Sequence, residues 1–243
     1  MNRLNFAFVL TCLLGMPGLS IGAAPTCEAR SGARITPVIE LYTSEGCSSC
    51  PPADQWVSSL KGQGAVVQAF HVAYWDYIGW KDRFAQAKFS ARQKDIATRN
   101  GLNNIYTPQV VRNGRDWPQW RALRQLPGGD SAASFSLAVQ RVGESDSFEA
   151  RVSPQDGKAN WAAYWSVTED GHSSRVKSGE NAGEFLKHDF VVRQFEHVGS
   201  YQGPQTLRFV SVAGQADHSR RINLVVTDTQ TGATLQAVSL PCM

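Results

Sequence analysis

The chain has 243 residues, of which 42% are hydrophobic and 19% are charged, and its formal net charge at pH 7 is +3. This composition is typical of a globular protein with a substantial core, and it excludes a collagen, a coiled coil or a disordered chain. So small a charge gives no reason to expect nucleic acid as the partner. The chain contains five cysteines, an odd number that is awkward in an oxidising compartment.

The N-terminus has the pattern of a secretory signal peptide. Arg3 precedes an apolar run over residues 4–16, and small residues follow at 20–24. The run of about 13 residues is shorter than the ~20 that a membrane-spanning helix needs. We therefore expect residues 1–23 to be removed on export, followed by an N-terminal segment over residues 24–35. The mature protein is then periplasmic or secreted and has no membrane span.

Residues 36–127 alternate between strand-like and helix-like stretches. Apolar runs of β type predict strands over 38–42 and 66–74, and amphipathic patterns predict helices over 53–60, 84–99 and 117–126. An Asn-Gly pair at residues 113–114 predicts a hairpin turn. This order of elements predicts an α/β layer fold for residues 36–127.

The pattern changes after the Pro-Gly-Gly-Asp sequence at 127–130, because the apolar residues then alternate with a period of two. Strands are predicted over residues 134–140, 148–152, 161–167, 190–195, 207–212, 222–227 and 235–240. Regularly spaced strands of this kind, joined by turn residues, predict an all-β, sandwich-like second domain over residues 131–243.

The sequence Cys47-Ser-Ser-Cys50 lies directly after the first predicted strand and before the first predicted helix. At a helix N-terminus, free N–H groups and the helix dipole stabilise a thiolate. Cys47 is thus the candidate attacking thiol, and Cys50 is placed to resolve a mixed disulfide. Two prolines at 51–52 indicate that the helix begins after Cys47, which weakens the dipole argument.

Other uses of this cysteine pair remain open. A structural zinc site usually needs a second matching pair, and haem attachment needs His where the chain has Pro51. A static structural disulfide is an alternative, as is a copper site in which His71 assists Cys47 and Cys50.

A second motif strengthens the redox interpretation. Thr107-Pro108 precedes the predicted hairpin. Together with the Cys-x-x-Cys motif and the order of elements over residues 36–126, it resembles the thioredoxin superfamily. The resemblance implies that Pro108 is a cis-proline beside the thiols and that it presents the backbone of a substrate to Cys47, with Thr107 next to it.

A narrower resemblance covers nearly the whole mature chain. The motifs that carry it are Glu40–Asp54, His71–Asp76, Gly79–Asp82, Arg92-Gln93, Tyr106–Gln109, Gly179–Gly183 and Leu186–Arg193. These resemble the exported bacterial proteins grouped as domain of unknown function 1223, a family name that records no activity.

Several residues near the motif have more than one interpretation. Trp75 is a candidate wall of a peptide groove or a packing residue, and Asp76 is a candidate base for the resolving thiol or a helix cap. Glu45 is expected to be a solvated turn residue. His71 is expected to be a hydrogen-bonded core histidine, and the pair at 188–189 is expected to be structural.

The remaining cysteines suggest a clamp. Loss of Cys12 with the signal peptide leaves four, and Cys27 and Cys242 lie near the two ends of the mature chain. We expect a structural disulfide between these two, which would restrict the unfolded chain.

The sequence therefore predicts an exported thiol-disulfide oxidoreductase that acts on protein thiols or disulfides of the cell envelope. It would use no cofactor and no metal. The alternatives are a non-catalytic binding module with a structural Cys47–Cys50 disulfide and a copper-handling protein.

Overall fold

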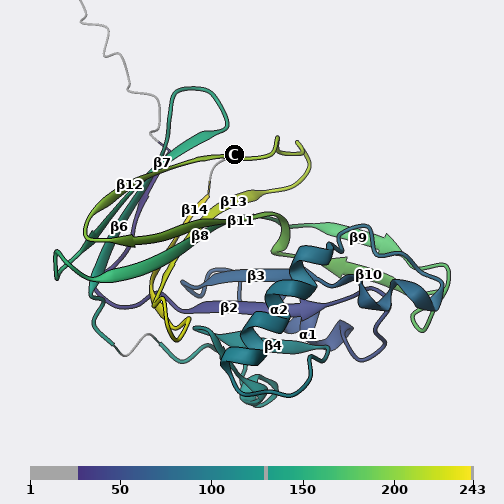
Figure 1. Ribbon diagram of the computed structural model, residues 1–243. Coiled ribbons are helices and arrows are strands. Elements are labelled where there is room, and N and C mark those ends of the chain that lie inside the picture. The colour runs from purple at the N-terminus through teal and green to yellow at the C-terminus, as the bar shows by residue number, and fades with distance from the viewer. Residues whose placement is uncertain (1–26, 129–130, 242–243) are drawn as a thin grey trace, which may run out of the picture.

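The computed structural model describes residues 27–128 and 131–241, and most of their secondary structure is β-strand (Figure 1). A four-stranded sheet has the order β1 (Glu28–Arg30), β6 (Phe135–Arg141), β7 (Ser147–Pro154), β12 (Gln205–Val210). An eight-stranded sheet has the order β14 (Thr234–Pro241), β13 (Arg220–Thr227), β8 (Asn160–Glu169), β11 (Val191–Gln202), β3 (Val66–His71), β2 (Val38–Thr43), β4 (Gln109–Arg112), β5 (Arg115–Asp116). The third sheet is the pair β9 (His172–Arg175) and β10 (Phe185–His188).

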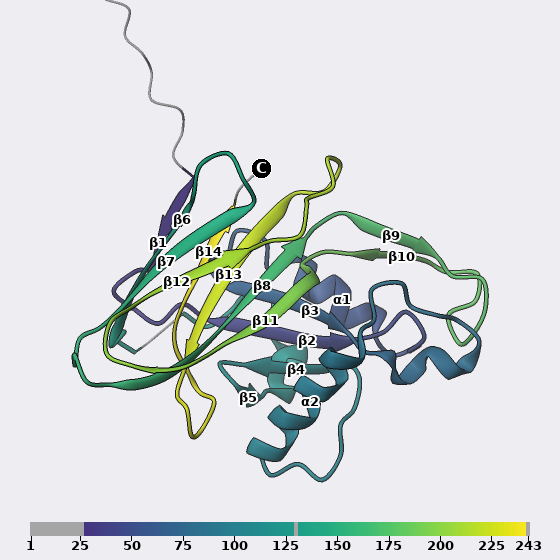
Figure 2. The same ribbon diagram turned by 45° about the horizontal axis from the view of Figure 1, so that its top comes forward.

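The helices of the described residues are few and short. They are α1 (Pro51–Ser58), α2 (Ala87–Arg99) and the 3-10 helices η1 (Ala73–Ile78) and η2 (Pro118–Ala122). Figure 2 shows α1 and α2 beside the β2, β3 and β4 end of the large sheet, with the β9–β10 hairpin extending beyond the same end. None of these helices is long and apolar enough to cross a membrane.

The predicted α/β thioredoxin-like fold of residues 36–127 is wrong. The helix expected over 117–126 is only the short 3-10 helix η2. The described residues form far more strand than helix, which does not fit the alternation of strands and helices in an α/β fold. Moreover, β3 pairs in parallel with β11 through Val191 and Ala69, so the early strands form part of the eight-stranded sheet. The periodicity of apolar residues indicates whether one segment is a strand or a helix. It does not indicate which distant strand pairs with that segment in the sheet. The strands predicted after residue 131 are confirmed, with shifted ends.

The large sheet is covered on both faces where it carries the cysteine turn. Side chains alternate along β2: Val38 and Tyr42 pack with Phe89 of α2, whereas Ile39 and Leu41 pack with Ala53 and Val57 of α1. All six residues of β2 are buried, as are all six of β3. This burial explains their nearly continuous apolar sequence.

A second part of the hydrophobic core lies between the four-stranded sheet and the β8, β13 and β14 strands of the eight-stranded sheet. Residues of β6, β7 and β12 pack against residues of β8, β13 and β14, with Trp161 and Trp165 fully buried among them. Burial of the large apolar faces of these strands holds the four-stranded sheet on the eight-stranded one.

Candidate functional site

The candidate site is the turn that connects β2 to α1. Cys47 and Cys50 form a disulfide across it, with their Cα atoms 5.4 Å apart. Backbone hydrogen bonds from Cys47 to the Ser44 carbonyl and from Cys50 to the Cys47 carbonyl define two consecutive turns. The helix begins at Pro51 with Cys50 as its N-cap residue, which confirms that the helix starts after Cys47.

The first turn of α1 has no N–H group available to the cysteine sulfurs. Pro51 and Pro52 have no N–H group, and the N–H groups of Ala53 and Asp54 both donate to the carbonyl of Cys50. The first turn of α1 therefore offers no free backbone donor to a thiolate, contrary to the sequence-based argument.

Side-chain hydroxyl groups lie next to Cys47 instead. The Thr107 hydroxyl lies 3.4 Å from the Cys47 sulfur, and the Ser49 hydroxyl also lies 3.4 Å from it. Trp75 of η1 donates its indole N–H to the Thr107 oxygen at 2.8 Å. The Thr107–Pro108 peptide bond is cis, as the resemblance implied. Thus Trp75, Thr107 and Pro108 are brought to the disulfide.

Asp76 is not brought into contact with the cysteines. Its carboxylate accepts the backbone N–H of Asp82 at 3.2 Å, within the loop that follows η1. Burial raises the pKa of Asp76 from its ordinary value. The contacts of Asp76 therefore support the loop, and none supports the predicted role as a base for Cys50.

Both cysteines are covered, and each has 0% of its surface exposed. The segment 176–184 between β9 and β10, which we call the strap, lies against the cysteine turn. Asn181 donates its side-chain N–H groups to the carbonyls of Glu45 and Cys47, at 2.9 and 3.1 Å. Glu180 accepts the backbone N–H and the hydroxyl of Ser48. The strap is thus hydrogen-bonded to the turn that carries the buried disulfide.

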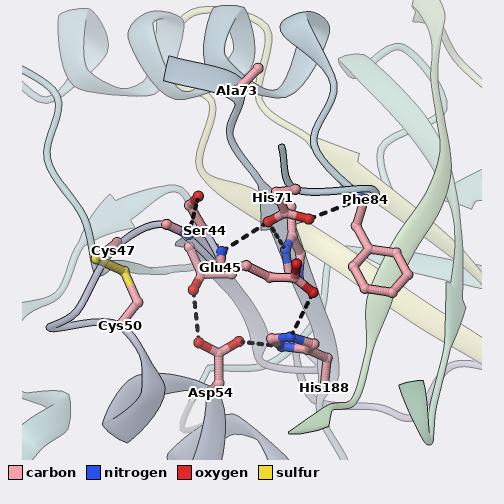
Figure 3. Close-up of polar contacts among 12 residues, drawn as sticks. Ser44, Glu45, Cys47, Cys50, Asp54, His71, Ala73, Phe84 and His188 are labelled. Carbon is pink, nitrogen blue, oxygen red and sulfur yellow. Dashed lines mark hydrogen bonds and ion pairs between the residues drawn. A yellow bond between two sulfur atoms is a disulfide. The ribbon is translucent and has the colours of Figure 1, made fainter. Parts of the chain in front are cut away.

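A buried charged cluster lies below the disulfide, as Figure 3 shows. His188 of β10 stands between two carboxylates, with Nδ1 3.3 Å from Asp54 and Nε2 3.3 Å from Glu45. Asp54 also accepts the Thr43 hydroxyl, and Glu45 accepts the indole N–H of Trp80. Glu45 is fully buried, so its predicted place as a solvated turn residue is wrong.

His71 of β3 and Asp82 form the second half of the cluster. Nδ1 of His71 lies 2.7 Å from Oδ2 of Asp82, and both side chains are fully buried. Asp82 also accepts the backbone N–H groups of Glu45 and Phe84. His71 is therefore a hydrogen-bonded core histidine, as predicted.

The charge state of the cluster follows from these contacts. Burial disfavours ionisation of Asp82, but the charge of His71 and the hydrogen bonds to Asp82 lower its pKa to about 2. Burial likewise opposes the imidazolium form of His188, but its contacts with Asp54 and Glu45 raise its pKa to about 10. Burial opposes the ionised form of Glu45, yet the contact with His188 and other hydrogen bonds lower its pKa. The cluster thus holds ionised groups in a buried place.

Sequence reasoning missed most of this cluster. It assigned no role to Asp54 or Asp82 and left His188 as structural, although all three lie in the motifs that define the resemblance. Asp54 lies four residues after Cys50, a helical spacing that points to the same face. The pairing with His188 depends on the β9–β10 hairpin, which the sequence patterns do not predict. The signal peptide, Cys12 and Cys242 lie outside the described residues.

Comparisons with known proteins place the chain in a family. The model of the protein family DUF1223, described as a protein of unknown function, matches residues 38–227 of this chain. A protein of Agrobacterium tumefaciens solved by X-ray crystallography is similar in fold, with 23% identity and a TM-score of 0.65; 87% of this chain and 96% of that chain are covered. HBP35 of Porphyromonas gingivalis has 11% identity and a TM-score of 0.56, with 87% and 76% covered.

No curated protein matches the chain, and the reported matches do not support the predicted membership of the thioredoxin superfamily. The resemblance to domain of unknown function 1223 is confirmed, since the matched region includes the cysteine turn, the buried cluster and the strap. The chain belongs to the DUF1223 family.

Proposed function

We propose that this protein is a thiol-disulfide oxidoreductase of the cell envelope that acts on protein thiols or disulfides through Cys47 and Cys50. The observation that carries the proposal is the disulfide itself, with the Thr107 hydroxyl on the Cys47 sulfur. Hydroxyl donors stabilise a thiolate, and a stabilised thiolate is both a good leaving group and a reactive nucleophile near neutral pH.

The proposed reaction exchanges one disulfide for another. A substrate thiolate attacks the Cys47 sulfur, which forms a mixed disulfide and releases Cys50 as a thiolate that takes up a proton. A second substrate thiolate then attacks the substrate sulfur of the mixed disulfide. This step leaves the substrate oxidised and Cys47 and Cys50 reduced, and the reverse sequence reduces a substrate.

The burial of both cysteines supports a second candidate, a binding protein whose Cys47–Cys50 disulfide is structural. The two candidates differ in reduction potential. The reduction potentials of structural disulfides typically lie below about −300 mV, whereas those of the active-site disulfides of oxidoreductases range from about −270 to −120 mV.

The test mixes the oxidised protein with a reduced peptide that contains two cysteines. We expect one equivalent of peptide disulfide to form as Cys47–Cys50 is reduced. In a second reaction, reduced Cys50→Ala is mixed with the disulfide form of the peptide, and we expect its Cys47 thiolate to attack that disulfide and accumulate a mixed disulfide. Cys47→Ala is the matched control, which should trap no adduct at that position. A potential below about −300 mV and no trapped adduct would favour the structural disulfide.

We also propose a periplasmic or secreted location, on the basis of the N-terminal pattern. Cell fractionation of the full-length protein, with mass spectrometry of its N-terminus, tests this. Recovery of intact residues 1–23 in the cytoplasmic fraction would contradict it.

A further inference from the structure

We propose that Asp54, His71 and His188 bind a divalent transition-metal ion, and that Zn²⁺ is the ion that fits best. The site lies below the Cys47–Cys50 disulfide and does not use either sulfur (Figure 3). Its occupancy therefore does not depend on the proposed redox activity.

The three residues converge from separate elements: Asp54 from α1, His71 from β3 and His188 from β10. Each offers one ligand atom, and these atoms all lie within 4.8 Å of one another. Because α1 and β10 are in contact and β3 is central in the large sheet, the fold fixes the positions of all three.

His71 is oriented as metal-binding histidines are. Both oxygens of Asp82 accept backbone N–H groups, and Nδ1 of His71 lies 2.7 Å from one of them, so Nδ1 is placed to donate to Asp82 and Nε2 faces away from it. This Nε2 is buried and has no hydrogen-bond partner among the described residues. A carboxylate that holds the far nitrogen of a ligating imidazole is the usual second-shell arrangement. An unpartnered buried nitrogen is costly, and a metal ion would supply its partner.

His188 meets the same requirement from either side. His188 becomes a ligand when the ion displaces one of its two N–H protons, and whichever nitrogen then binds the ion, the other faces a carboxylate, of Glu45 or of Asp54. Its Nε2 and the Oε1 atom of Glu45 form an ion pair at 3.3 Å, and neither of these two buried atoms makes a hydrogen bond within the described residues. Glu45 is thus placed as a fourth ligand or as a second-shell carboxylate.

The ligand set and charge select the class of ion. Two imidazoles with carboxylates suit Zn²⁺ and its transition-metal neighbours, whereas Ca²⁺ and Mg²⁺ prefer oxygen ligands alone. Glu45, Asp54 and Asp82 bring three carboxyl groups to the two histidines within a buried volume. A bound divalent ion would supply among these carboxyl groups the positive charge that is lost when His188 gives up a proton.

A route into the site exists. A cavity of about 150 Å³ is lined by Ser44, Asp54, Gln55 and His188, together with other residues of α1 and β10. Ligand atoms on tetrahedral zinc lie roughly 3.4 Å apart, given Zn–N distances of about 2.0–2.1 Å. The cluster is therefore somewhat wider than a loaded site, and the side chains must close around the ion by about 1 Å.

The test is calorimetric titration of the full mature protein with Zn²⁺, with Cys47–Cys50 kept oxidised. We expect one ion per chain, and we expect His71→Gln and His188→Gln each to weaken binding by more than the 10–100-fold that loss of a second-shell partner costs. The exposed His197→Gln is the matched control and should bind as the wild type does.

Two further measurements keep the proposal testable if a variant does not fold. Wild-type protein titrated with Co²⁺ should develop the visible absorption of a four-coordinate site, and Cys47→Ala/Cys50→Ala should bind Zn²⁺ unchanged. The proposal is overturned by failure of the oxidised wild type to bind either ion. It is also overturned by binding that persists in both histidine variants, or by binding that is lost with the cysteines.

Discussion

At the scale of single residues, Asp82 organises the buried cluster. Its Oδ2 atom accepts from His71 and from the backbone of Glu45, and its Oδ1 atom accepts from the backbone of Phe84. These three contacts hold the cysteine turn, β3 and the loop after η1 in one arrangement. Every donor around this carboxylate is satisfied only while both of its oxygen atoms can accept.

We predict that Asp82→Asn lowers the free energy of unfolding by about 2–3 kcal/mol, because an amide N–H₂ then faces an N–H donor and a bond to a charged group is lost. Urea denaturation measures the change. Asp95→Asn on the exposed face of α2 is the control and should change stability by less than about 0.5 kcal/mol. Equal stability of the two variants would show that Asp82 does not organise the cluster.

Thr107 acts at the same scale, on reactivity. Its hydroxyl contacts the Cys47 sulfur and accepts the indole N–H of Trp75. We predict that Thr107→Val, which keeps the shape but removes the hydroxyl, slows alkylation of Cys47 by iodoacetamide several-fold in the reduced protein, because the thiolate loses a donor. Thr107→Ser should restore most of the rate. An unchanged rate in Thr107→Val would remove the hydroxyl from the proposed chemistry.

At the scale of elements, we predict that the strap limits access to the disulfide. It is held over the cysteine turn by the two hydrogen bonds of Asn181 and by the exposed contact between Glu180 and Ser48. Ser178 adds a hydrogen bond to the carbonyl of Gly79 at the end of η1. Segments that open locally are typically held by a few polar contacts of this kind and bury little apolar surface.

We predict that Asn181→Ala speeds reduction of the Cys47–Cys50 disulfide by dithiothreitol about 30-fold. Two hydrogen bonds at about 1 kcal/mol each are lost from the closed state, so the open state becomes more populated. Asn104→Ala, an exposed loop variant, is the control. If both variants are reduced at the wild-type rate, the strap does not limit access.

Elements also mark the extent to which this fold follows from sequence. Period-two patterns located β6, β7, β8, β12, β13 and β14, because each of these strands buries a continuous apolar face. The segment 190–195, which does not alternate, located β11. The hairpin β9–β10 was not predicted: its two strands are short, and the polar segment His172–Arg175 resembles a loop. Because β10 carries His188, the charged cluster could not be predicted without predicting this hairpin. Local patterns located the cysteines and Thr107, but the cluster arises from contacts between distant segments.

At the scale of the whole molecule, the early and late parts of the chain meet in the large sheet. The β3–β11 pairing joins them through backbone, and Arg92 of α2 joins them through side chains. Arg92 makes a bidentate pair with Glu40 of β2, and its guanidinium lies 4.3 Å from the ring centroid of Tyr164 of β8. Tyr164 in turn donates its hydroxyl to Glu40. Both parts therefore share one buried polar network.

We predict that the protein unfolds in a single calorimetric transition and that Arg92→Ala shifts this entire transition. The variant leaves Glu40 buried without its cation, which costs about 3–5 kcal/mol, and the midpoint should fall by about 10 °C for a chain of this length. Lys94→Ala, on the exposed face of α2, is the control and should leave the midpoint nearly unchanged. Two resolved transitions, with only one of them sensitive to Arg92, would show that the two parts are stable independently. A single transition that moves as a unit would show that the shared sheet and the Glu40–Arg92–Tyr164 network make the molecule cooperative.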